Sequence, residues 1–324
     1  MKTPALKVSD YRTGLFQIAL LFMVLGMLYW KVQTLDLDFV SWLAAWFVAL
    51  DGSQYLLLTV LIFLMPLNWS MEAGKWQALA APVQRLSFLQ SIAGVLSGLS
   101  LSFVGPNAIA DYLGRIWQVQ QVRRYRLLGA VLINRITQLS VTLACGLWGL
   151  MAFAERQKTG LSLSLYIVIV LSGLLLLLSI VILLLRRRIA PLLLRWGWRR
   201  LAAALRILQA YRQQTILKVW LLALLRYGVF ALQFFIALRL CGVGEPAGVL
   251  MAGITWVFLI KSVVPGIQAL QSLGIRELSA LIFFEGISPQ LTAIIWAGLL
   301  LWGINILVPA TGGAFTLLRA KIKA

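Results

Sequence analysis

The sequence contains no histidine, and only 10 of its 324 residues are acidic. The absence of histidine excludes imidazole acid–base catalysis, histidine proton relays and histidine metal sites. The two cysteines, Cys145 and Cys241, lie far apart near apolar segments. They are therefore interpreted as small buried apolar residues, and neither a disulfide nor a metal pair is expected. No cofactor is predicted.

Several catalytic motifs are also missing. There is no G-x-x-x-x-G-K-[ST] loop, which excludes ATP hydrolysis by that mechanism. There is no G-x-S-x-G nucleophile motif and no cluster of metal-binding carboxylates. Asp111 could hold a divalent ion in a glycosyl-phosphate transferase, but one carboxylate is a weak signal for such a site. These absences favour a transporter-like protein over an enzyme.

What the sequence does contain is apolar residues. Hydrophobic residues make up 61% of the chain and charged residues 12%, and the mean hydropathy is +0.91. Such a composition is typical of a polytopic membrane protein. Long apolar runs predict helices, because a barrel would need short alternating segments. The net charge of +19 lies mainly in connecting segments, which indicates cytoplasmic loops and attraction to anionic lipids, with no nucleic-acid partner.

We expect an all-α polytopic protein of the cell (inner) membrane, with one integral membrane domain over residues 1–324. The charge pattern predicts that both termini are cytoplasmic. The first apolar run is interpreted as a retained span, because no small-residue cleavage site follows it. About six full spans are predicted, at residues 14–30, 55–69, 127–153, 161–185, 216–240 and 291–310.

Two further apolar stretches contain helix breaks. Residues 86–115 are rich in small residues and are interrupted at Gly105-Pro106-Asn107, where Asn107 is a favourable N-cap. Residues 247–285 are interrupted at Pro265-Gly266. Both are interpreted as re-entrant or broken-helix hairpins that enter from opposite faces, as in inverted-repeat transporters. Self-similarity between the two halves is too faint to establish such a repeat.

Residues 186–213 form a basic segment with eight arginines and no acid. Its tryptophans and leucines predict an amphipathic helix on the cytoplasmic leaflet. A purely topogenic role is sufficient to explain the same arginines, and a direct role in gathering anionic headgroups is not required.

Charged residues inside apolar segments indicate the working site. Each ionisable group at the bilayer centre costs at least roughly 2.5–3.5 kcal/mol on insertion scales. Guanidinium groups match phosphate oxygens in a bidentate manner and stay charged. The alternatives are that the charges only pair with one another, and that residues 261–285 form an external loop and an ordinary helix. Glu72 and Lys75 are interpreted as a surface pair, and Asp111 and Arg115 as an i,i+4 pair.

The candidate substrate-binding residues share a position beside a helix break or inside an apolar span. They are Pro106, Asn107, Asp111, Arg115, Arg135, Arg226, Lys261, Pro265, Gln271, Gly274, Arg276 and Glu277.

Two motifs resemble those of a known family. Pro106-Asn-Ala-Ile-Ala-Asp-Tyr-Leu-Gly-Arg115 is similar to a P-x-R-x-G-[ED]…R element, with Ala108 in place of the basic residue and Ala110 in place of the glycine. Pro265 followed by Gly274-Ile-Arg-Glu277 is similar to a P…G-[VI]-R-E element. Both resemble the flippase-like transmembrane region of lysylphosphatidylglycerol synthases and the related stand-alone membrane proteins. The resemblance implies lipid translocation. Aminoacyl transfer, the task of a separate domain, is not expected of this chain.

The sequence therefore predicts a protein that binds and translocates an anionic phosphate-containing lipid, either a phospholipid or a polyprenyl-phosphate conjugate. Two alternatives stay open: a membrane transferase that uses a polyprenyl-phosphate donor, and a non-transporting partner subunit of an envelope-lipid synthesis complex. An oligomer or a partner protein is compatible with each.

Overall fold

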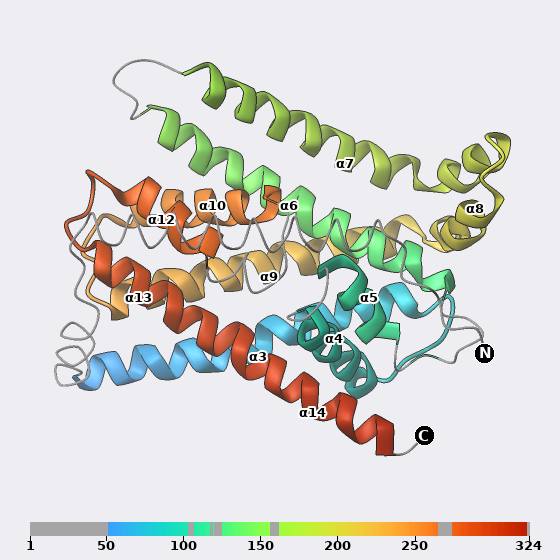
Figure 1. The fold of residues 1–324 in the computed structure, drawn as a ribbon, viewed down its shortest axis with the longest axis horizontal. Coiled ribbons are helices and arrows are strands. Elements are labelled where there is room, and N and C mark those ends of the chain that lie inside the picture. Colours follow the sequence, from blue (N-terminus) through green and yellow to red (C-terminus); the bar gives the residue numbers. More distant parts are fainter. Residues whose placement is uncertain are drawn as a thin grey trace, which may run out of the picture.

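The computed structural model describes residues 51–102, 107–116, 119, 125–155, 162–264 and 274–322. Within these ranges the chain folds into helices joined by short turns and contains no β-strand (Figure 1). The predicted all-α class is therefore confirmed for the part of the chain that is described. The predicted span at residues 14–30 lies outside it.

In the described part of the chain, five helical segments are long and apolar enough to cross a bilayer, and each coincides with a predicted span. A bilayer core of about 30 Å needs roughly 20 apolar helical residues. The five segments are α3 (Gly52–Ala80), residues Tyr125–Glu155 containing α6 (Leu128–Glu155), residues Leu165–Arg195 of α7 (Leu163–Arg195), α9 (Gln213–Leu240), and residues Leu291–Leu317. The last comprises α13 (Leu291–Trp302), the π-helical turn η4 (Gly303–Leu307) and most of α14 (Val308–Ile322).

The outer surface of these helices is apolar. Along α7, Leu171, Leu174 and Leu177 are each more than half exposed. A helix with apolar side chains all round is typical of a membrane span, because in water it would be a large exposed hydrophobic surface. These helices identify a membrane protein by length and composition.

Two pairs of short helices pack among the long ones. The first pair is α4 (Phe88–Ser102) with α5 (Asn107–Ile116), and the second is α10 (Ala247–Val263) with α12 (Arg276–Phe284). In Figure 1 the pairs lie toward opposite ends of the long helices. These pairs occupy the two stretches that the sequence predicts as hairpins.

Glycines allow the short helices to approach closely. A Cβ atom on Gly114 of α5 would lie 2.2 Å from the backbone nitrogen of Gly98 on α4. In the other pair, a Cβ on Gly253 of α10 would lie 2.3 Å from the Phe284 ring of α12. Small residues at such crossings bring two helix backbones together, as they do at many contacts between membrane helices.

The basic segment differs from its prediction as one amphipathic helix over residues 186–213. Helix α7 continues to Arg195 and ends in a Schellman motif, with Gly197 at φ 80° and the Trp198 N–H bonded to the Leu193 carbonyl at 2.9 Å. Two short helices follow, α8 (Arg199–Leu205) and the 3₁₀ helix η2 (Arg206–Ala210). The prediction of one continuous helix was wrong because Gly197 supplies a left-handed stop within the segment.

Candidate functional site

A cavity of about 450 Å³ lies among α3, α4, α5, α6, α9, α10 and η4. Its lining contains five cationic side chains and two carboxylates, an excess of three positive charges among the described residues. Apolar walls come from two separate clusters of buried hydrophobic residues. Leu99 and Ile136 belong to one cluster, and Phe258, with Phe230 packed against it, belongs to the other. The charged lining residues are Glu72, Lys75, Asp111, Arg115, Arg135, Arg226 and Lys261.

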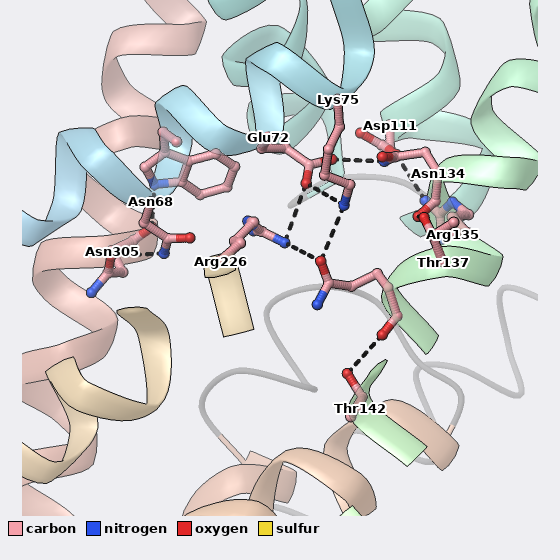
Figure 2. A network of polar contacts seen from close by, with 12 residues as sticks. Asn68, Glu72, Lys75, Asp111, Asn134, Arg135, Thr137, Thr142, Arg226 and Asn305 are labelled. Atoms are coloured by element: carbon pink, nitrogen blue, oxygen red, sulfur yellow. Dashed lines mark hydrogen bonds and ion pairs between the residues drawn. The ribbon is translucent and has the colours of Figure 1, made fainter. Parts of the chain in front are cut away.

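Glu72 of α3 is the centre of the polar network. Its Oε1 accepts hydrogen bonds from Arg115 Nη2 at 2.8 Å and from Asn134 Nδ2 at 2.7 Å. Its Oε2 accepts one from Lys75 Nζ at 3.0 Å and lies 3.3 Å from Arg226 Nη1 (Figure 2). The Glu72 side chain is 4% exposed. Three cations from three helices therefore share one buried carboxylate.

The prediction of Glu72 and Lys75 as a surface pair was wrong. The ion pair exists, but both side chains are buried, and Lys75 Nζ also donates to Gln138 Oε1 of α6 at 3.1 Å. The i,i+3 spacing predicts only that the two side chains share a face of the helix. That face is turned toward α6 and α9, which the spacing alone cannot reveal.

Asp111 of α5 extends the network toward α6. Its Oδ1 accepts from Arg115 Nε at 2.7 Å, which confirms the predicted i,i+4 pair. Its Oδ2 accepts from Arg135 Nη2 of α6 at 3.1 Å. Arg115 thus donates to both cavity carboxylates, and it also lies 5.6 Å from the Trp76 ring centroid. A planar guanidinium can bridge in this way because its donors form a rigid fork.

Helix packing holds Asp111 and Arg115 in the cavity wall. A Cβ atom on Gly98 of α4 would lie 2.7 Å from Asp111 Oδ1 and 2.9 Å from the Asp111 carbonyl oxygen. A Cβ on Gly94, one turn earlier, would lie 3.1 Å from the Arg115 carbonyl oxygen. The glycine face of α4 therefore sets the position of α5 and its two charged side chains.

Arg226 of α9 is the least firmly held cation of the group around Glu72. Its Nη1 lies 3.3 Å from both Gln138 Oε1 and Glu72 Oε2, and its side chain is 22% exposed. Its guanidinium carbon is 5.4 Å from the Trp69 ring centroid. Lys261 of α10 lines the same cavity, lies 5.8 Å from the Phe230 ring centroid, and forms no ion pair with any described residue.

Several buried donors in the cavity wall have no hydrogen-bond partner in the described part of the chain. They include Arg115 Nη1, Arg226 Nε and the Tyr227 hydroxyl. A buried polar group without a partner costs roughly 1–3 kcal/mol. N–H and O–H groups of this kind can donate to an anion that enters the cavity, which would remove part of that cost.

Neutral polar residues form another part of the wall. Asn68 of α3 donates from Nδ2 to Asn305 Oδ1 of η4 at 3.3 Å, and the indole nitrogen of Trp69 donates to the Asn305 carbonyl oxygen at 3.0 Å. The sequence interpretation missed Asn68, Gln138 and Asn305. Each is an amide side chain within an otherwise apolar span, and that was the signal that could have identified them.

The second predicted motif contributes no described residue to the cavity lining. Arg276 donates from Nε to Glu277 Oε1 at 2.9 Å, and each side chain is 1% exposed. A Cβ atom on Gly298 of α13 would lie 3.0 Å from Glu277 Oε1. This ion pair packs between α12 and α13, and neither residue is among those that line the cavity.

The other predicted site residues have these positions. Gly274 is buried, two residues before the start of α12 at Arg276. Asn107 is the first residue of α5. Pro106, Pro265 and Gln271 lie outside the described residues. The structure brings together five of the predicted residues: Asp111, Arg115, Arg135, Arg226 and Lys261.

The donor set of the cavity suits anions better than metal ions. Within the described residues no three acidic or cysteine side chains lie close enough to hold a metal together. The two cavity carboxylates already accept from arginine and lysine, so a cation placed there would have to displace those partners. Comparison of the chain with models of known protein families and with curated proteins gives no match.

Proposed function

We propose that this chain binds the phosphate of an anionic membrane lipid in the central cavity and moves that lipid between the leaflets. The observation that carries the proposal is the excess of cations over carboxylates in the cavity lining. A network that only locked helix packing would be expected to balance its charges, because an uncompensated buried charge is costly. A bound phosphate would supply the missing negative charge.

The size and surroundings of the cavity favour a lipid over a soluble anion. A volume of about 450 Å³ is within the range of small-molecule sites and accommodates a phospholipid headgroup. The surrounding helices are apolar on the outside, so acyl or polyprenyl chains can stay in the bilayer while the headgroup enters. The resemblance of the Pro106–Arg115 and Pro265–Glu277 motifs to a flippase-like family agrees with this proposal.

Arg226 is the cation best placed to take the phosphate. It has an unpaired buried Nε, and its contacts to Glu72 and Gln138 are the longest around that carboxylate. An incoming phosphate oxygen can replace these contacts, after which Glu72 keeps Lys75, Arg115 and Asn134 as partners. Charge-assisted hydrogen bonds from guanidinium to phosphate are about twice as strong as neutral ones.

For translocation, we propose the alternating-access arrangement of inverted-repeat transporters. In this proposal six full spans lie in the inner membrane with both termini in the cytoplasm. The pairs α4–α5 and α10–α12 are re-entrant hairpins that rock in turn around the cavity. Their positions toward opposite ends of the long helices support this arrangement (Figure 1).

Binding of short-chain lipids tests the headgroup assignment. Dissociation constants of dioctanoyl phosphatidylglycerol and of uncharged dioctanoylglycerol would be measured for the wild type, Arg226→Gln and Lys218→Gln. Lys218 is an exposed cation on the same helix and serves as the charge-matched control. Because one phosphate contact is lost, the dissociation constant of the phospholipid should rise roughly tenfold in Arg226→Gln and should not change in Lys218→Gln. Equal affinity in all three proteins, or a new covalent lipid product, would contradict the proposal.

A further inference from the structure

A second pocket, of about 590 Å³, shares no lining residue with the central cavity. It lies where α7, α8 and η2 meet the turn after α3 and the residues directly before α6. Its charged lining residues in the described part of the chain are Arg126, Arg199 and Arg206, and none of the described lining residues is acidic. Alanines, among them Ala190 and Ala202, form much of its wall. The pocket therefore combines three positive charges with small side chains that leave room for a ligand.

The arginines of this pocket are available to a ligand. Arg199 and Arg206 are exposed residues and form no ion pair with any described residue. Arg126 is held by its neighbour: its Nε donates to the Tyr125 hydroxyl at 3.2 Å, and its guanidinium carbon lies 5.7 Å from that ring centroid. Three unneutralised guanidinium groups around one concavity match the oxygens of a phosphate group.

The elements that carry these arginines are fixed to one another. Tyr211, directly after η2, donates from its hydroxyl to the Leu79 carbonyl of α3 at 2.7 Å. Its own carbonyl accepts from Arg186 Nη2 of α7 at 3.2 Å. Ile207 of η2 packs so closely on α6 that a Cβ atom on Gly129 would lie 2.6 Å from its Cγ2. The pocket is therefore a preformed feature and not a chance gap between loops.

The pocket lies near the C-terminal end of α7, which places it at the membrane surface. From Leu165, about 20 helical residues span the bilayer core, so the helix leaves the hydrocarbon near Arg186. Trp196 and Trp198, next to the pocket, are 65% and 60% exposed. Exposed tryptophans at the end of a span are typical of the headgroup region. Leu194, which also lines the pocket, is exposed and can contact acyl chains.

We infer that this pocket is a binding site for the phosphate of an anionic phospholipid of the adjacent leaflet, separate from the central cavity. Basic pockets between helices at the membrane surface bind anionic headgroups by the same chemistry. The shared requirement is a phosphate group, which a lipid or free phosphate can supply. The exposed Leu194 of the pocket and the neighbouring tryptophans favour a lipid over free phosphate.

Two charge-matched triple variants test this site. Arg126→Gln/Arg199→Gln/Arg206→Gln removes the pocket arginines, whereas Arg188→Gln/Arg195→Gln/Arg212→Gln removes three exposed arginines of the same segment that do not line the pocket. Ala203→Cys, on the exposed pocket wall, reports occupancy when Cys145 and Cys241 are replaced by alanine. The readout is the rate at which a soluble thiol reagent labels Ala203→Cys in detergent, with and without dioctanoyl phosphatidylglycerol.

We expect the phospholipid to slow labelling in the parent and in the control triple variant. The phospholipid concentration that halves the labelling rate should rise at least about tenfold in the pocket triple variant. Inorganic phosphate is tested in parallel: equal protection by phosphate assigns the site to the phosphate group itself, and protection by the lipid alone assigns it to the whole lipid. Equal weakening in both triple variants, or no protection of the parent, would overturn the inference.

Discussion

Arg115 on α5 donates from Nη2 to Glu72 Oε1 on α3 at 2.8 Å, although the two residues are 43 positions apart in the sequence. The same guanidinium donates from Nε to Asp111 Oδ1 at 2.7 Å. Through Arg115 the polar network is continuous from Arg135 on α6 to Arg226 on α9 (Figure 2). Its members come from four helices, so the network connects the α4–α5 pair to the long helices that surround it.

Glu72→Gln should strongly destabilise the protein, because it leaves Lys75, Arg115 and Arg226 without their shared carboxylate. Removing one partner of a buried ion pair costs about 3–5 kcal/mol. Thermal unfolding in detergent measures the effect. Glu155→Gln, at the exposed end of α6, is the matched control and should unfold like the wild type. Similar unfolding temperatures for the two variants would contradict the central position of Glu72.

The contact between Arg115 and Glu72 should appear as an energetic coupling. A double-mutant cycle with Arg115→Gln and Glu72→Gln should give a coupling free energy of about 1–3 kcal/mol, because the double variant removes both charges of the pair. The same cycle with Glu155→Gln in place of Glu72→Gln should be additive. Additive effects in the first cycle would show that the two side chains act independently.

Gly114→Ala should prevent correct packing of α5 on α4. The added methyl group would lie 2.2 Å from the Gly98 nitrogen, and backbone atoms cannot move aside as a flexible side chain can. Gly228→Ala on α9 is the control, because nothing lies within 4 Å of its Cβ position. Yield and unfolding temperature in detergent should fall for Gly114→Ala only. A stable Gly114→Ala protein would contradict the close approach of these helices.

Much of the helical layout could be predicted from the sequence, because span length and apolar composition are local properties. The structure has an apolar helix at every predicted span that it describes. The candidate site was harder to predict from the sequence. Asp111 and Arg115 were identified from their i,i+4 spacing, but the burial of Glu72 depends on α6 and α9, whose orientation no local pattern specifies.

Arg276 also shows that the sequence alone does not specify the role of a charged residue. Its motif and its apolar surroundings predict contact with a lipid headgroup. The structure pairs it with Glu277, and neither side chain is among the described residues that line the cavity. Charge in an apolar segment indicates that a residue faces protein or water. It does not distinguish a ligand-binding cation from one that holds two helices together.

Arg276→Ala should therefore reduce the amount of folded protein, because it leaves the buried Glu277 carboxylate unpaired. The double variant Arg276→Ala/Glu277→Ala should recover part of the loss, since removing both charges avoids a buried single charge. Size-exclusion profiles of the solubilised variants compare them. If Arg276→Ala folds like the wild type but loses lipid transport, Arg276 contacts the lipid and the structural interpretation is wrong.

Acidification should weaken the start of α3. The Asp51 carboxylate accepts from the Ser53 hydroxyl and from the Gln54 N–H, which lowers the pKa of Asp51. Because the folded pKa is lowered, the cap is fully formed above the ordinary aspartate pKa of about 3.9 and is lost as the pH falls through the folded pKa. Amide exchange in the first turn, corrected for intrinsic rates, should increase at acidic pH in the wild type but not in Asp51→Asn, whose cap does not titrate.

The most direct test of lipid movement is transbilayer exchange in proteoliposomes. Vesicles containing the wild type, Arg226→Gln or Lys218→Gln would carry fluorescent phosphatidylglycerol in both leaflets. A membrane-impermeant reductant added outside would then destroy the fluorescence of every labelled lipid that reaches the outer leaflet. We predict that the wild type and Lys218→Gln expose the inner-leaflet lipid to reduction, and that Arg226→Gln slows this exposure by at least about tenfold. Equal rates in all three proteins, or rates no faster than in protein-free vesicles, would contradict lipid translocation through the cationic cavity.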